Sequence, residues 1–262
     1  MRNFSTTKRI VIKIGTNLIT TENALDTEYM DHPFFDWLPV FRIMAMTSGL
    51  EAPLPFGDNP IGGLGFDADF MIGAAAHNRH DTTMAMVRRY AEANPKGMAY
   101  PWTAFFWDDP ELGRGDGEAF PTIGYFPDVG STFFHDEWKA GGVSALFRCG
   151  PLGGFELNKY REESGKYINV AHDDPDANSF VIGIGPDLVA LTSGYSHIKQ
   201  SSNHNTILVN GAGQRPPGRK EGMVYSQPGG DDMREFAYTT GWLADGAVVG
   251  IEGEARSEER RV

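Results

Sequence analysis

Residues 143–149 read VSALFRC, and their side chains alternate between two faces of an extended chain. A similar alternation of apolar side chains recurs at residues 179–184, SFVIGI. Successive side chains of a β-strand point to opposite faces of a sheet, so this period of two predicts two strands. Turn signals follow at Asn210-Gly211 and at residues 228–230, Pro-Gly-Gly, and no helical pattern separates the runs. We therefore predict an antiparallel β-sandwich over residues 118–255.

Two shorter apolar runs and a lone cysteine refine this prediction. Residues 188–191 and 206–209 are typical of further short strands. Cys149 is the only cysteine, which excludes an internal disulfide framework. It shares one face of its predicted strand with Val143 and Phe147, so we expect a packed thiol and not a nucleophile.

The region before the predicted sandwich, residues 30–112, has the helical period instead. Residues 33–48, PFFDWLPVFRIMAMTS, place apolar side chains at helical spacing with only two charges. We expect a buried helix that bends or begins again near Pro39. Shorter helices are predicted at residues 67–76, at 81–93 with Asp81 as the N-cap, and at 100–107. The predicted fold class is α+β, helices followed by an antiparallel sandwich.

The composition of the chain excludes several classes of protein. Acidic residues outnumber basic residues 35 to 23, giving a formal charge of −12, which argues against a nucleic-acid binder. No apolar run approaches the length of about 18 residues that a membrane-spanning helix needs. We expect neither nucleic acid nor a membrane as a partner.

The two ends differ in composition from the middle. Residues 8–14, KRIVIKI, predict a short strand followed by a turn at Gly15. Residues 1–20 resemble the opening of glutamate 5-kinase, which implies ATP binding through Lys13 and Gly15. We interpret them as a foreign segment, because no nucleotide-binding sheet follows, and Lys13 also interrupts any signal peptide. Residues 256–262, RSEERRV, match a translated sequencing adapter, so we interpret them as an artefact or as a charged tail.

Residues 172–176, His-Asp-Asp-Pro-Asp, form the densest polar segment of the chain and stand just before a predicted strand. Four ionisable groups beside a buried strand suffer desolvation and mutual repulsion, which a bound cation offsets. His197 and His204 follow later, the second of them just before another predicted strand. Two imidazoles and a carboxylate at such positions suit a divalent metal. The alternative is an acidic loop whose side chains cap turns.

Three ordered motifs carry a resemblance to the heparinase II/III-like polysaccharide lyases. The family has a His-x-His-x-Asp-x-x-Ser-Phe segment, a strand end similar to Asp-Pro-Gly-Tyr, and His-Asn-Thr before a strand. This chain has HDDPDANSF at 172–180, LTSGY at 191–195 and HNTILVNG at 204–211, followed by Gly213-Gln214. The resemblance covers about residues 30–255, and it implies that the helices are the remnant of an (α/α) toroid.

The resemblance implies a metal site and a catalytic histidine. It gives His172 a catalytic or carboxylate-neutralising role, and it makes Asp174 and His204 metal ligands. The family's third ligand falls at Thr192, a poor zinc ligand, so a harder cation, or no metal, fits better than zinc. Water or His197 would then complete a weak site.

The resemblance also implies a substrate, a location and a truncation. Such lyases cleave uronic-acid polysaccharides by β-elimination and are periplasmic or secreted. Arg215 and Arg219, in a local basic loop, and Tyr195 are the predicted substrate-binding residues. The family's catalytic tyrosine has no counterpart in residues 30–110, which predicts a C-terminal part that is inactive alone. The alternative is a carbohydrate-binding sandwich module without catalysis, and a kinase is the third class.

Overall fold

The structure is a computed structural model of the chain. It describes residues 20–21, 24–25, 30–57, 59, 61, 68–95, 101–165, 174–195, 200–211, 213–214, 236–245 and 248–256. In the described part of the chain the two-residue strands β1 (Thr20–Thr21) and β2 (Ala24–Leu25) are followed by the helices α2 (Pro33–Met44), α3 (Ala68–His77), α4 (Asp81–Ala93) and α5 (Pro101–Trp107). None of the helices in the described part of the chain is long and apolar enough to cross a membrane.

A five-stranded antiparallel sheet follows the helices. Its strands are β3 (Ile123–Phe126), β4 (Ser131–His135), β5 (Val143–Arg148), β6 (Ser179–Ile184) and β7 (Asp187–Ala190), and their order in space is the order in sequence. Strands β8 (Phe236–Asp245) and β9 (Val248–Arg256) pair as a separate antiparallel hairpin. Helices followed by antiparallel sheets confirm the predicted α+β class.

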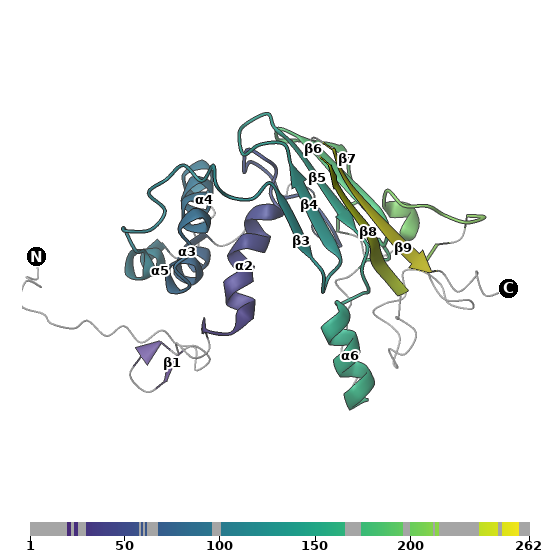
Figure 1. Cartoon of the computed structure of the whole chain (residues 1–262), viewed down its shortest axis with the longest axis horizontal. Helices are drawn as coiled ribbons and strands as arrows, with labels where there is room; N and C mark the ends of the chain where they lie inside the picture. Colours follow the sequence, from purple (N-terminus) through teal and green to yellow (C-terminus); the bar gives the residue numbers. More distant parts are fainter. Residues whose placement is uncertain are drawn as a thin grey trace, which may run out of the picture.

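The hairpin lies over the face of the sheet that is turned away from the helices (Figure 1). Trp242 of β8 stacks on Phe134 of β4 with ring centroids 6.2 Å apart. Cys149, just after β5, contacts the carbonyl oxygens of both hairpin strands and is fully buried. Burial raises the pKa of its thiol, which confirms a packed, protonated cysteine.

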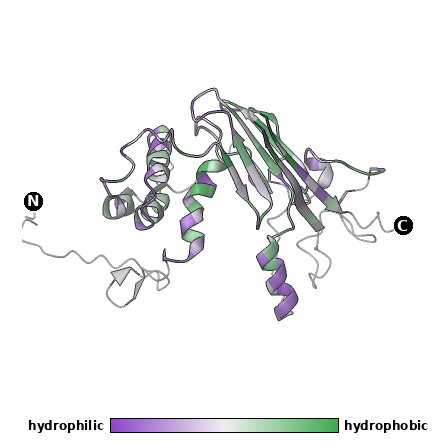
Figure 2. Cartoon of the chain, viewed as in Figure 1, coloured by the Kyte–Doolittle hydropathy of each residue, from purple (hydrophilic) through white to green (hydrophobic). Residues whose placement is uncertain are grey.

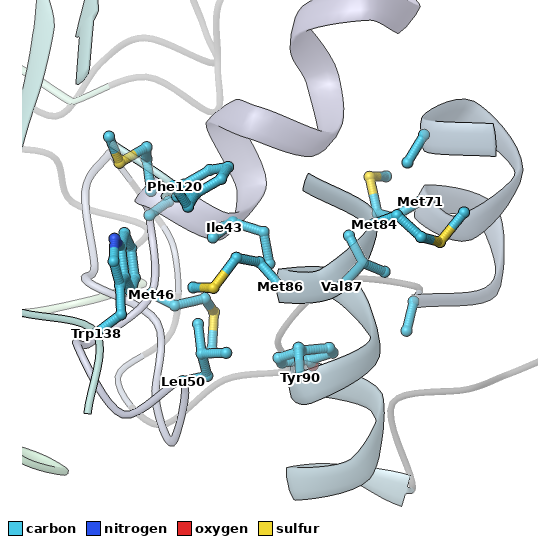
Figure 3. Packing of buried hydrophobic residues seen from close by; sticks show 14 of the residues in the cluster. Ile43, Met46, Leu50, Met71, Met84, Met86, Val87, Tyr90, Phe120 and Trp138 are labelled. Atoms are coloured by element: carbon cyan, nitrogen blue, oxygen red, sulfur yellow. The ribbon is translucent and has the colours of Figure 1, made fainter. Parts of the chain in front are cut away.

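The main core lies between the other face of the sheet and the helices. Phe133, Leu146 and Val181 stand opposite one another on neighbouring strands and are almost fully buried. Ile43 and Met44 of α2 belong to the same cluster. The cluster continues into α4 and the loops on either side, as Figure 3 shows for Met84, Met86, Val87, Tyr90 and their neighbours. A shared core of this kind means that helices and sheet stabilise each other.

The two faces of the sheet differ from the sequence-based expectation. On β5 the face of Leu146 is the deeply buried one, while Val143, which shares the face of Cys149, is exposed. On β6 Val181 is buried, whereas Phe180 and Ile184 are exposed. Alternation alone gives two faces but not their environments, and here the helices cover one face while the hairpin covers part of the other.

The helix prediction over residues 33–48 needs correction. Helix α2 runs without a break through Pro39 and ends at Met44. It is not buried all round, because Phe34 and Trp37 are 57% and 60% exposed. The next two predicted helices, near 67–76 and 81–93, are confirmed as α3 and α4. The N-cap of α4 is His80, and Asp81 instead accepts a hydrogen bond from the Gly113 amide at 2.8 Å.

The structure corrects three further predictions of secondary structure. Helix α6 (Phe155–Ser164) stands between β5 and β6, where no helix was expected. It buries none of its residues and is mostly hydrophilic (Figure 2), so it has no apolar period to detect. Residues 206–209 do not form one of the named strands, and Ile207 is exposed. Arg256, expected to begin the tail, is the last residue of β9, while residues 8–14 and 257–262 lie outside the described residues.

A buried histidine ties the helical region to the sheet. His135 of β4 lies with Nε2 3.1 Å from the Met44 carbonyl oxygen and Nδ1 3.1 Å from the Ser48 hydroxyl. Burial lowers the pKa of His135 from 6.5 to about 4, so the ring is neutral near pH 7. A carbonyl oxygen only accepts hydrogen bonds, and Nε2 therefore carries the proton.

We predict that Leu146→Ala lowers the free energy of unfolding by about 2–5 kcal/mol, because it leaves a cavity in the main core. Ile184→Ala, on the exposed face of β6, should cost about 1 kcal/mol or less. Urea unfolding followed by circular dichroism measures both. Equal losses would contradict the assignment of the two faces.

We predict that His135 makes the fold acid-sensitive between pH 6.5 and about 4. Its pKa is lower in the folded than in the unfolded chain. Its contribution is therefore fully present above pH 6.5 and is lost as the pH falls toward 4, by about 3 kcal/mol in all. Urea unfolding at several pH values should show a flatter pH dependence for His135→Gln than for the unaltered chain. His77→Gln is the control, and parallel curves for the unaltered chain and His135→Gln would refute the prediction.

Candidate functional site

Asp174 and His204 come together in the folded chain. Asp174 stands just before β6, and His204 follows a short 3-10 helix, η2 (Ser201–Asn203). Asp174 Oδ2 lies 3.7 Å from His204 Nε2, and the two side chains are 3% and 1% exposed, respectively. Two polar groups, 30 positions apart in the sequence, thus share one buried location.

Thr192 belongs to the segment beside this pair. It follows β7 and is buried, and its Oγ1 accepts a hydrogen bond from the Gly194 amide at 3.1 Å. The next residue, Ser193, donates its amide hydrogen to the carbonyl of Asn203 at 2.9 Å. This bond joins the segment of Thr192 to the residue that precedes His204.

The other predicted site residues are only partly visible. Tyr195 is described and is 48% exposed, which leaves it accessible to a ligand. The predicted catalytic residue His172, the predicted substrate-binding residues Arg215 and Arg219, and His197 lie outside the described residues. Their assignments therefore stay predictions.

The described residues do not make a complete metal centre. Among them, no group of three or more histidine, cysteine, aspartate or glutamate side chains is placed to hold a metal ion. Asp174 and His204 supply one carboxylate and one imidazole, and Thr192 adds only a hydroxyl. Structural and catalytic zinc sites have at least three strong protein ligands, and this set falls short of that requirement.

A second buried ionic contact lies next to Asp174 in the sequence. Arg148, at the end of β5, forms an ion pair with Asp176, and both residues are almost fully buried. The Asp176 amide also donates to the carbonyl of Asp174 at 2.8 Å, so the two aspartates share one tight turn. Buried charges are stable only when they are paired and hydrogen-bonded, and the guanidinium offsets the charge of Asp176.

Asp176 also connects the sheet to the helical region. Its Oδ2 accepts the amide hydrogen of Gly57 at 3.2 Å. Gly57 has a φ of +55°, a conformation that favours glycine. This hydrogen bond attaches the loop after α2 to the turn that carries Asp174.

Sequence reasoning missed Arg148 and gave Asp176 no role. A charge in an otherwise apolar strand is a usable signal, because an inward-facing arginine requires a buried acid. The partner is not readable from sequence, since Asp176 and Asp173 stand in the same acidic segment. The fold selects Asp176 by placing its turn beside the end of β5.

The arrangement provides a buried carboxylate and imidazole with a charged pair next to them. The Asp174 carboxylate lies beside the His204 imidazole, and oxygen and nitrogen donors of these kinds bind cations and polar ligands. Arg148 and Asp176 hold the neighbouring backbone in place. This combination suits electrostatic contact with a cation or a polar ligand.

Comparisons with known proteins give structural likenesses only. Neither a protein-family model nor a curated protein matches the chain. The chain is similar to a solved heparinase III gene product, with 16% identity, 89% of this chain and 29% of that chain covered, and a TM-score of 0.49. It is also similar to the heparan sulfate lyase from Pedobacter heparinus, with 15% identity, 82% of this chain and 27% of that chain covered, and a TM-score of 0.44. For another heparinase III the identity is 11%, the coverage is 86% of this chain and 30% of that chain, and the TM-score is 0.46.

This chain therefore spans less than a third of the length of each of these proteins. The comparisons give no support to the resemblance of the first 20 residues to glutamate 5-kinase.

We predict that the purified chain binds divalent metal weakly, because two strong donors and a hydroxyl exchange metal readily. Elemental analysis should find metal that a chelator removes, and Asp174→Ala should abolish the binding. Asp187→Ala is the matched control, because Asp187 is an exposed residue of β7. Stoichiometric zinc that survives the chelator would contradict the prediction and would require a third strong ligand.

Proposed function

We propose that this chain is the C-terminal part of a polysaccharide lyase that cleaves uronic-acid polysaccharides by β-elimination. The observation that carries the proposal is the contact between Asp174 and His204. These residues belong to the first and the third of the sequence motifs that resemble the lyase family. The second motif contains Thr192 and Ser193, and Ser193 is bonded to the segment of His204. Three motifs read from sequence alone thus belong to neighbouring segments.

The proposed reaction has one difficult step. A base removes the proton from C5 of the uronate, the C4–O4 bond breaks, a C4–C5 double bond forms, and an acid protonates the departing O4. The C5 proton is only weakly acidic, so the adjacent sugar carboxylate must be neutralised while the base acts. Cationic and hydrogen-bonding groups around the carboxylate are therefore required in any such site.

We assign the carboxylate-neutralising or catalytic role to His172, two positions before Asp174. Asp174 and His204 are the candidate metal ligands. A divalent cation, when bound, would add positive charge near the substrate. Tyr195, which is exposed, and the loop with Arg215 and Arg219 are the proposed substrate contacts.

The charge of the chain makes the basic loop important to this proposal. A chain with a formal charge of −12 repels a polyuronate in general, so attraction must be local. The loop at 215–220 combines Arg215, Arg219 and Lys220 without an acidic residue. We further propose that the whole protein is periplasmic or secreted, where such polysaccharides are encountered.

We predict that this chain alone produces little or no unsaturated uronate, because the catalytic tyrosine of the family belongs to the helical toroid. The assay is ultraviolet absorbance on a panel of polyuronates, performed on this chain and on a longer gene product with a complete helical domain. The longer protein should show elimination that His172→Ala abolishes and that His77→Ala leaves unchanged. Robust turnover by this chain alone would refute the truncation, and no turnover by the longer protein would refute the lyase.

A carbohydrate-binding module is the second candidate, and one observation favours it. Trp242 and Tyr125 are both half-exposed, with ring centroids 6.3 Å apart, and Trp242 stacks on Phe134. Half-exposed aromatic rings suit contact with the apolar faces of sugars. Glycan binding that survives His172→Ala but is lost in Trp242→Ala, without elimination by the longer protein, would favour this candidate over the lyase.

A further inference from the structure

The side-chain amide of Gln214 forms two hydrogen bonds with the backbone of Ala177. One is accepted and one is donated, as between paired residues of neighbouring β-strands. Its Oε1 accepts the Ala177 amide hydrogen at 3.0 Å, and its Nε2 donates to the Ala177 carbonyl oxygen. Ala177 is almost fully buried, so both of its backbone groups need partners inside the protein. The primary amide of Gln214 supplies a donor and an acceptor to a single residue of the turn.

Ala177 transmits this contact to Asp174. It directly follows Asp176, whose amide is bonded to the Asp174 carbonyl. The side chain of Asp176 is held in turn by Arg148 and by the Gly57 amide. The turn that presents Asp174 is therefore fixed at Asp176 by an ion pair and a hydrogen bond, and at Ala177 by Gln214.

Gln214 is also bonded to the segment that carries His204. Its backbone amide donates to Ser201 Oγ at 2.9 Å, and the Ser201 carbonyl accepts the His204 amide hydrogen at 3.1 Å. Its Nε2 lies 3.1 Å from Thr206 Oγ1, and the Thr206 hydroxyl donates to the Ala177 carbonyl at 2.8 Å. One residue thus bridges the two segments whose side chains meet in the site.

A neighbouring amide fixes the same segment to the sheet. Asn205 donates through its Nδ2 to the Phe180 carbonyl at 2.9 Å and to the Leu191 carbonyl at 3.2 Å. These bonds hold the residue after His204 against β6 and the segment that follows β7. Asn205 therefore sets the distance of the His204 segment from the sheet, while Gln214 sets its distance from the Asp174 turn.

We propose that Gln214 is a positioning residue that fixes the separation of Asp174 and His204. The contacts are those of this chain, and their importance for catalysis rests on the proposed lyase function. Loss of the amide removes the bonds to Ala177 and Thr206 together. The Thr206 hydroxyl then remains bonded to the Ala177 carbonyl, so the Asp174 turn and the His204 segment are held together less tightly.

The experiment compares side chains of similar size at position 214. Gln214→Met removes every polar group, and Gln214→Glu keeps an acceptor but loses the two donated bonds. Gln200→Met is the matched control, because Gln200 is exposed and lies at the start of the same segment. The readout is the His204 ring signal in the NMR spectrum at one fixed pH, assigned with His204→Gln among the seven histidines of the chain.

We expect Gln214→Met to shift the His204 ring signal, Gln214→Glu to shift it less, and Gln200→Met to leave it unchanged. A lower Tm in Gln214→Met with an unmoved His204 signal would overturn the proposal and reduce Gln214 to a structural role. Should Gln214→Met fail to fold, the signal in Gln214→Glu decides in the same way. The signal is measured without substrate, so failure of the lyase proposal and failure of this one give different results.

Discussion

The ion pair between Arg148 and Asp176 is the contact on which the candidate site depends. A guanidinium and a carboxylate lose hydration when they are buried, and their attraction offsets that loss only in good geometry. Removing one partner of such a pair costs about 3–5 kcal/mol, because it leaves the other charge buried. Asp176 also accepts the Gly57 amide, so the pair joins the end of β5, the Asp174 turn and the loop after α2. Any change at this point displaces three parts of the fold together.

The sheet that carries the site has two unlike faces. One face, with Phe133, Leu146 and Val181, packs on the helices and excludes water. The other face is covered in part by the β8–β9 hairpin through Trp242 and Cys149, and it exposes Phe180 and Ile184. The buried face supplies the rigidity, since close packing leaves little room for the strands to shift. The strand ends, where the turns begin, are left to carry polar groups.

These polar groups lie on segments held by side-chain amides and not by strand pairing. Residues 200–207 follow β7 without joining the sheet as a named strand, although their sequence has strand-like residues. Ser193 instead donates to the Asn203 carbonyl, and the Gln214 amide donates to the Ser201 hydroxyl. The Asn205 side chain donates to the Phe180 carbonyl. Such bonds are directional and short in reach, so they specify one arrangement of a loop where a strand would specify a register. These hydrogen bonds therefore set the relative positions of Asp174 and His204.

The sequence by itself determined the class of the fold and singled out the segments that bring Asp174 and His204 together. The change from a helical period to a period of two needs no tertiary information, because each pattern reflects local geometry. The motifs that contain Asp174, Thr192 and His204 were likewise recognised from their residues and from their order along the chain. Helix α6 was not, because a helix that buries none of its residues has no apolar stripe.

Only the tertiary structure decided which face of each strand is buried and which charges meet. Val143 and Phe180 look like core residues in sequence, yet the helices pack on the opposite face. The sequence alone did not identify the acidic partner of Arg148. In the fold, the turn before β6 places Asp176 beside it, and the two form an ion pair. In the sequence Gln214 was only the last residue of a motif. The tertiary structure shows that its side-chain amide is hydrogen-bonded to Ala177. Contacts between distant segments depend on how the elements pack, and no local pattern of residues contains that information.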